Sequence, residues 1–272
     1  MLNLFKIFFS KFLLLFKLRI VNSSVDIYSD DPFFIVSKFL DREKVNLIID
    51  GGASIGETSQ RFSNLFPNAS IHAFEPFPDF YSLLKKKAKL NDKIIPYPLG
   101  LGKNDGDVIF HVNKSTGTNS ILASNTKSKE IYGELLQVDH QIKIPLTRLD
   151  DIFDINDNKS IDILKLDLQG TELDALIGAS QLLDHGKINA ILCEVMFVPS
   201  YDHQPSWVEL VTFIEKNNLS LFNIYQRHFY KGQLIQADLL FMRNELLSAT
   251  ELKRSELFHN YSEIIKSQNY DS

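Results

Sequence analysis

The sequence predicts a doubly wound α/β fold, with a mostly parallel β-sheet covered by helices on both faces. Short apolar runs alternate with helical patterns four or five times along the chain, as in consecutive βαβ units. The first apolar run ends at a glycine turn that leads into a helix. With 272 residues, 44% of them hydrophobic, the chain is long enough for one large core.

The predicted strands are short apolar runs bounded by polar residues or turns. Asn46–Asp50 stops at a glycine turn, as a buried parallel strand does. The other candidates are 70–74, 93–98, 107–112, 141–146, 161–166, 188–195, 220–225 and 237–242. The polar stretch 113–129 is expected to be a loop. Ligands bind such sheets beyond the carboxyl ends of the strands, so the site is expected there.

The predicted helices carry apolar residues at helical spacing. They span 32–40, 57–65, 77–90, 172–184, 207–217 and 246–266. In the third helix, Leu83, Leu84 and Leu90 are expected to face inward. We divide the chain into an N-terminal helix (1–21), a linker and helical lead-in (22–45), the α/β domain (46–245) and a C-terminal helix and tail (246–272).

The first 20 residues form a basic, Phe- and Leu-rich segment with no uncharged stretch long enough to span a membrane. A helix here places Lys6 and Lys17 in one polar arc, with apolar residues around most of the rest. One interpretation is a helix lying on a membrane surface; the other is a helix docked on protein. We expect a cytoplasmic protein, which the first interpretation would place at the inner face of a membrane.

Charge and cysteine content narrow the class of protein. The net charge of −5 argues against a nucleic-acid partner, which a broad basic surface would bind. The one cysteine, Cys193, lies in an apolar run and is expected to be a packed strand residue. Because one cysteine gives neither a disulfide framework nor a zinc cluster, a reducing compartment is expected.

A glycine turn follows the first strand and is the first candidate site. Its residues are Asp50, Gly51, Gly52, Ala53, Ser54, Ile55 and Gly56. Glycines let a ligand approach the backbone, and the helix start offers unpaired N–H groups. Asp50 ends an apolar strand, where a carboxylate needs hydrogen bonds or a cationic partner. An ammonium or sulfonium ligand meets that need; the alternative is a structural carboxylate that caps local N–H groups.

Glu75 follows the second strand and is the second candidate. An acidic residue there can accept hydrogen bonds from both hydroxyls of an adenosine ribose. Pro76 fixes the turn that aims it. The alternative is a carboxylate that stabilises the start of the next helix.

The third candidate lies at the end of the strand 161–166, where Lys165 and Asp167 interrupt the apolar pattern. Asp167 can orient a substrate hydroxyl, accept its proton as a general base, or bind a divalent cation. Glu172 and Glu194 are possible partners, although Glu172 can equally cap its helix. His203, in a loop beyond Glu194, is a further candidate base or substrate contact. Whether a metal is needed stays open.

The sequence resembles the FkbM family of S-adenosylmethionine-dependent methyltransferases between Val45 and Arg243. The matching stretches are IIDGGASIGETS, HAFEPFP, TGTNSIL, LTRLDDI, ILKLDLQGTELDALIGA and EVMFVPSYDHQPSWVEL. The pattern LKxDxQGxExxxLxGA is the most specific of them. The resemblance implies a seven-stranded, Rossmann-like sheet with a final antiparallel strand. It also implies S-adenosylmethionine as cofactor and a hydroxyl acceptor, typically on a sugar, a glycan or a secondary metabolite.

By position, the resemblance also implies roles for residues. The turn from Asp50 to Gly56 would hold the methionine part of the cofactor, and Glu75 the ribose. Asp167 and Gln169 would lie at the methyl-transfer end. Beside the adenine would lie Leu99 and Gly100. The resemblance assigns no catalytic base.

Two other classes stay open. The turn also reads G-x-A-x-x-G, a relaxed dinucleotide turn, which keeps an NAD-dependent oxidoreductase as an alternative. The strand-end Asp50 and the late hairpin near Phe222 and Phe241 argue against it. The other alternative is a membrane-surface scaffold that kept the fold and lost catalysis. The sequence leaves the oligomeric state open.

Overall fold

The computed structural model describes residues 31–156 and 159–247, which belong to a compact unit that begins at Asp31. The predicted N-terminal helix (1–21) lies outside the described residues, as does nearly all of the predicted C-terminal helix and tail. Within the described ranges, no helix is long and apolar enough to cross a membrane.

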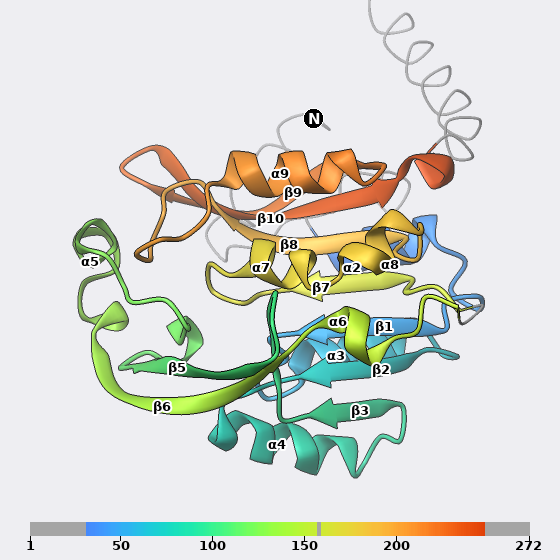
Figure 1. Ribbon diagram of the computed structural model, residues 1–272. Helices are drawn as coiled ribbons and strands as arrows, with labels where there is room; N and C mark the ends of the chain where they lie inside the picture. The colour runs from blue at the N-terminus through green and yellow to red at the C-terminus, as the bar shows by residue number, and fades with distance from the viewer. Residues whose placement is uncertain (1–30, 157–158, 248–272) are drawn as a thin grey trace, which may run out of the picture. The chain divides into compact units, whose positions relative to one another are not determined.

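The main sheet has seven strands in the order β3-β2-β1-β7-β8-β10-β9 (Figure 1). The strands are β1 (Leu47–Gly51), β2 (Ser70–Phe74), β3 (Ile94–Tyr97), β7 (Ile163–Leu166), β8 (Ala190–Met196), β9 (Leu219–Tyr230) and β10 (Gln233–Arg243). The first five are parallel, and β10 is antiparallel to both of its neighbours. The predicted fold class is therefore confirmed, including the closing antiparallel hairpin.

Helices cover both faces of this sheet. On one face lie α2 (Pro32–Phe39), α3 (Glu57–Leu65) and α4 (Pro78–Ala88), and on the other α7 (Glu172–Ile177), α8 (Ser180–Asp184) and α9 (Trp207–Lys216). Strand side chains alternate between faces, so Ile49 packs under the second group and Ile48 under the first. By the same alternation Asp50 faces α3. Asp50 is thus buried between the sheet and this first group of helices.

A second, smaller sheet follows β3 along the chain. It pairs β4 (Gly100–Leu101), β6 (Val138–Thr147) and β5 (Gly106–Asn113) in the order β4-β6-β5, and β6 leads into α6 (Leu149–Ile152). Phe110 and Ile144 pack on Phe77, at the start of α4. The expected strands 107–112 and 141–146 are present here, each longer than predicted. This sheet therefore forms a wall over the carboxyl ends of the parallel strands.

Three local predictions are wrong. The expected loop 113–129 holds the short 3₁₀ turn η2 (Thr116–Thr118) and the start of α5 (Thr126–Tyr132), which Asn125 caps by accepting from the Ser128 N–H at 2.7 Å. After α5 comes a second 3₁₀ turn, η3 (Gly133–Leu136).

The expected helix 172–184 is instead two helices. They separate at Gly178, where an added Cβ would lie 2.0 Å from the Gly102 carbonyl oxygen. The chain must therefore pass close to the loop after β4, and the helix bends there. In α4 only Leu84 is buried, while Leu83 and Leu90 are exposed. This helix therefore packs on the sheet through one narrow row of side chains. The spacing of apolar residues in the sequence did not show which leucines belong to that row.

Candidate active site

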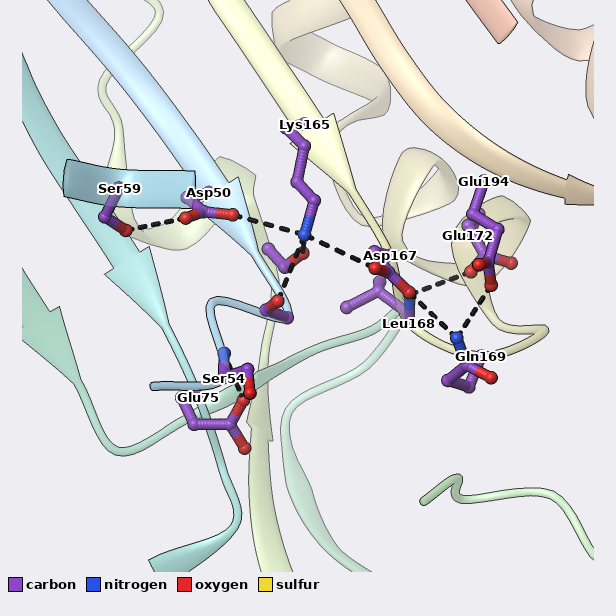
Figure 2. Close-up of polar contacts among 12 residues, drawn as sticks. Asp50, Ser54, Ser59, Glu75, Lys165, Asp167, Leu168, Gln169, Glu172 and Glu194 are labelled. Atoms are coloured by element: carbon purple, nitrogen blue, oxygen red, sulfur yellow. Dashed lines mark hydrogen bonds and ion pairs between the residues drawn. The ribbon is translucent and has the colours of Figure 1, made fainter. Parts of the chain in front are cut away.

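A row of charged side chains crosses the carboxyl ends of β1 and β7. Asp50 is fully buried, and its Oδ2 accepts a hydrogen bond from the Ser59 hydroxyl at 2.6 Å. Lys165, directly beside it in register, places Nζ 3.3 Å from Asp50 Oδ1 and 3.7 Å from Asp167 Oδ2. Figure 2 shows Lys165 lying between the two carboxylates.

Lys165 supplies the cationic partner that Asp50 needs. Burial alone would lower the pKa of Lys165, but the carboxylates of Asp50 and Asp167 outweigh it and raise that pKa to about 12. The ammonium also donates to the carbonyl oxygens of Gly51 at 3.3 Å and Gly52 at 3.1 Å. Asp50 therefore lies behind the glycine turn and supports it through Lys165.

The turn itself depends on glycine at two positions. Gly52 has φ of 72°, and a Cβ there would lie 2.0 Å from the Asp167 carbonyl oxygen. Gly56 has φ of 80° and caps the start of α3. These contacts bring the chain after β7 against the turn after β1. Two candidate segments far apart in sequence thus meet.

Glu75 closes the other side of the turn. Its carboxylate accepts from the Ser54 N–H and the Phe77 N–H, each at 2.8 Å. Burial raises the pKa of Glu75 to about 7, although these two N–H groups act in the opposite direction. The side chain is held rigidly at the end of β2, with Pro76 next to it. Glu75 therefore meets both expectations. It lies beside the glycine turn, where a ligand would bind, and it accepts an N–H group at the start of α4.

These groups surround a cavity, which we call the glycine-loop cavity, with a volume of about 210 Å³. Its lining residues are Gly52, Ser54, Glu75, Pro76, Phe77, Phe80, Gly100, Leu101, Phe110, Thr116, Gly117, Asn119, Ile121, Ile144, Leu146, Asp167, Leu168, Gln169 and Thr171. Seven of the predicted cofactor residues are among them. The other five, which do not line it, are Asp50, Gly51, Ala53, Gly56 and Leu99.

Gln169 connects the candidate residues at the far end of this cavity. Its amide nitrogen donates to Asp167 Oδ1 at 2.9 Å and to Glu194 Oε2 at 2.7 Å (Figure 2). Its amide oxygen accepts from the Tyr201 hydroxyl at 2.9 Å, and its carbonyl accepts from the Ser120 hydroxyl at 2.8 Å. Because every polar atom of the amide is engaged, Gln169 fixes how both carboxylates are oriented.

Glu172 is buried and Glu194 is half-buried, and their environments favour the protonated form. Burial, followed by the charge of Asp167, raises the pKa of Glu194 well above its usual range. Burial also raises the pKa of Glu172 to about 7. Glu172 accepts from the N–H groups of Leu168 at 2.8 Å and Gly170 at 3.3 Å, so it caps the loop before α7.

Neither the metal nor the histidine candidates gain support from the geometry. Among residues 31–156 and 159–247, no three His, Cys, Asp or Glu side chains are grouped to hold a metal ion. His203 lies in an exposed turn with φ of 60° and lines neither cavity. His72 is half-buried, and its Nδ1 lies 2.9 Å from the Tyr97 hydroxyl. Cys193 is buried, as expected.

A second cavity of about 400 Å³ lies between the first group of helices and the closing hairpin, and we call it the hairpin cavity. It is lined by Phe33, Glu57, Thr58, Arg61, Lys165, Leu166, Asp167, Leu192, Glu194, Gln226, His228, Gln236 and Asp238. Asp167 is the one residue that lines both cavities. The two spaces therefore adjoin at the carboxylate that ends β7.

The sequence did not predict a site role for several of these residues. Tyr201 lies in a quoted motif, but nothing in its spacing shows that its hydroxyl reaches Gln169. Asp238 did leave a signal, since it is a carboxylate inside the apolar run 237–242, as Asp50 is in its own strand. His228 and Gln226 lie in the part of β9 beyond the predicted strand, so their position could not be inferred.

Comparison with known proteins identifies the family. Residues 50–221, more than half of the chain, match the family described as "Methyltransferase FkbM domain". The chain therefore belongs to the FkbM methyltransferase family. This membership does not support the alternative of an NAD-dependent oxidoreductase.

The individual relatives have low sequence identity to this chain. "Methyltransferase sdnD" of Sordaria araneosa is 30% identical over 160 residues, with 49% of this chain and 60% of the relative covered. "2-O-methyltransferase NoeI" of Sinorhizobium fredii (strain NBRC 101917 / NGR234) is 26% identical over 142 residues, covering 50% of this chain and 58% of the relative. The chain thus spans about 60% of the length of these curated relatives.

A solved structure shares the fold. The crystal structure of "Methyltransferase FkbM from Methylobacillus flagellatus KT" is similar with a TM-score of 0.50 and 18% identity, covering 75% of this chain and 45% of that one. At this identity the likeness shows the architecture alone, which agrees with the seven-stranded sheet described above.

Proposed function

We propose that this protein is an S-adenosylmethionine-dependent O-methyltransferase that acts on a hydroxyl of a sugar or glycan. The observation that carries the proposal is the junction at Asp167, where the glycine-loop cavity adjoins the hairpin cavity. Methyl transfer needs a cofactor space and an acceptor space that meet at one point, because the two reacting atoms must be aligned. The printed name of one relative, a 2-O-methyltransferase, also supports a hydroxyl acceptor.

The glycine-loop cavity fits the cofactor chemically. Each Glu75 oxygen already accepts one backbone N–H, but a carboxylate has about four acceptor sites, so the ribose hydroxyls can still donate to it. Phe77, Phe80 and Phe110 give the cavity an apolar wall suited to a flat purine. Asn119 is buried on this wall, and within the described residues its Nδ2 has no hydrogen-bond partner. When bound, S-adenosylmethionine supplies an electrophilic methyl group.

In this proposal Asp167 is the residue that handles the acceptor. Its side chain is 41% exposed, and Gln169 and Lys165 hold its orientation. It can accept a hydrogen bond from the acceptor hydroxyl and take its proton as general base. Bound S-adenosylmethionine would supply the methyl group, with its sulfur as the leaving group. Glu194 accepts hydrogen bonds from the side-chain amides of Gln169 and Gln236, so its carboxyl group is already engaged. Its contribution is to hold Gln169.

Calorimetric titration with S-adenosylmethionine tests the cofactor assignment. Wild type is expected to bind, and Glu75→Gln is expected to bind at least tenfold more weakly, because the amide presents one acceptor oxygen to the ribose instead of two. Glu134→Gln, a surface carboxylate whose side chain is 85% exposed, is the matched control and should bind as wild type does. No binding by folded wild type would favour the inactive scaffold instead.

We further propose that residues 1–20 hold the protein at the inner face of a membrane. Their basic, apolar composition supports this, and they lie outside the described residues. Deleting residues 1–20 should release the protein from anionic phospholipid vesicles in a flotation assay. Unchanged partitioning would contradict the proposal.

A further inference from the structure

The hairpin cavity collects polar side chains from both the helices and the hairpin. Glu57 and Thr58 come from the first turn of α3, Gln226 and His228 from β9, and Asp238 from β10. In the described part of the chain, none of these five side chains has a hydrogen-bond or ion-pair partner. The cavity wall therefore offers acceptors, donors and a hydroxyl that are free to bind a ligand.

Asp238 has the most unusual position of the five. It lies inside a strand whose neighbours Ala237 and Leu239 are buried in the core, and it is directly opposite Glu194 in the antiparallel pair. A partly buried carboxylate without a hydrogen-bond or cationic partner costs free energy. Burial, followed by the charge of Asp167, raises the pKa of Asp238 to about 6. Asp238 therefore lowers the stability of the fold, and contact with a ligand is a reason for a carboxylate at this position.

The two cations that line the cavity are already paired. Arg61 contacts Asp31 and lies over the Phe33 ring at 4.4 Å, and Lys165 is held by Asp50 and Asp167. The unpaired charged groups, Glu57 and Asp238, are therefore both acids. An anionic ligand would meet carboxylates without a free cation to balance it, whereas a hydroxyl can donate to a carboxylate and accept from an amide or imidazole.

We propose that the hairpin cavity is the acceptor site and that it selects an uncharged, hydroxyl-rich molecule over an anionic one. Asp238, Gln226 and His228 bind hydroxyls that are not methylated, and this positions one further hydroxyl at Asp167. The volume of about 400 Å³ lies within the range of small-molecule sites. This inference rests on the proposed function, since it assigns the second substrate of the same reaction.

Saturation-transfer NMR on the full chain tests the site with two probes of similar shape. These are methyl β-D-glucopyranoside, which is uncharged, and its C6 carboxylate analogue methyl β-D-glucuronide. We expect the glucoside to receive saturation and the glucuronide to receive at least fivefold less. Asp238→Ala should reduce the glucoside signal at least fivefold. Glu215→Gln, on the exposed side of α9, is the matched control and should leave it unchanged.

The outcomes separate this inference from the function it rests on. Titration of the same samples with S-adenosylmethionine reports on the glycine-loop cavity, and Asp238→Ala should bind the cofactor as wild type does. If wild type binds cofactor but the glucoside signal is absent, or is unchanged in Asp238→Ala, the acceptor assignment is overturned. Equal or stronger binding of the glucuronide would overturn the charge selectivity. Failure to bind the cofactor would instead overturn the proposed function.

Discussion

The two cavities are built in different ways. The glycine-loop cavity is shaped by main-chain turns: Gly52 presses against the chain after β7, and Glu75 is fixed by two backbone N–H groups. The lining of the hairpin cavity includes five side chains that have no partners among the described residues: Glu57, Thr58, Gln226, His228 and Asp238. The first is a rigid frame that tolerates little change. The second is adaptable, and substitutions there should alter recognition more than folding.

This difference also decides what the sequence could predict. The glycine turn and Glu75 lie within 26 consecutive residues, so local pattern was enough to find them. The hairpin cavity gathers residues from α2, α3, β7, β8, β9 and β10, and only the folded topology brings them together. Sequence likewise could not show that Lys165 would satisfy Asp50, because the pairing depends on the register of β1 and β7.

The largest effect is expected at the ion pair behind the glycine turn. Lys165→Met leaves the fully buried Asp50 without a cation and should lower the free energy of unfolding by about 3–5 kcal/mol. Lys103→Met, which removes an exposed ion pair with Asp174, should cost less than about 1 kcal/mol. Urea denaturation measures both. Equal losses would show that Lys165 does not support the turn.

A smaller loss is expected at the turn itself. Gly52→Ala combines a left-handed φ with a clash against the Asp167 carbonyl and should destabilise by about 3 kcal/mol. Gly232→Ala is the matched control, since its φ of 83° is similar but no atom lies within 4 Å of the added Cβ. It should cost only about 1 kcal/mol. Thermal unfolding measures both variants. Similar losses of stability would mean that the contact between the glycine turn and the chain after β7 is not rigid.

Glu172 predicts a pH dependence of stability. Its folded pKa of about 7 lies above its ordinary 4.5, so its contribution is complete below pH 4.5 and is lost as the pH rises through about 7. Between pH 5 and 8 the free energy of unfolding should therefore fall more in wild type than in Glu172→Gln, by about 3 kcal/mol at most. The surface variant Glu134→Gln should follow wild type. Parallel curves for wild type and Glu172→Gln would contradict the assignment.

The smallest effect on stability is expected in the hairpin cavity. Asp238→Asn removes a partly buried carboxylate that the like charge of Asp167 destabilises, and it should raise the free energy of unfolding by about 0.2–1 kcal/mol. His228→Ala, at an exposed position, should change it by less than about 0.5 kcal/mol. A decrease of more than about 2 kcal/mol in the free energy of unfolding at either position would show that this wall stabilises the fold. That result would contradict the difference proposed between the two cavities.

The most direct test of the central claim is a crystal structure of the full chain with S-adenosylhomocysteine, the demethylated form of the cofactor. We predict that the ribose hydroxyls bind Glu75, that the purine lies against the wall formed by Phe77 and Phe110, and that the sulfur atom faces Asp167 at the junction of the two cavities. A ligand seated wholly in the hairpin cavity, or with its sulfur directed away from Asp167, would contradict the account.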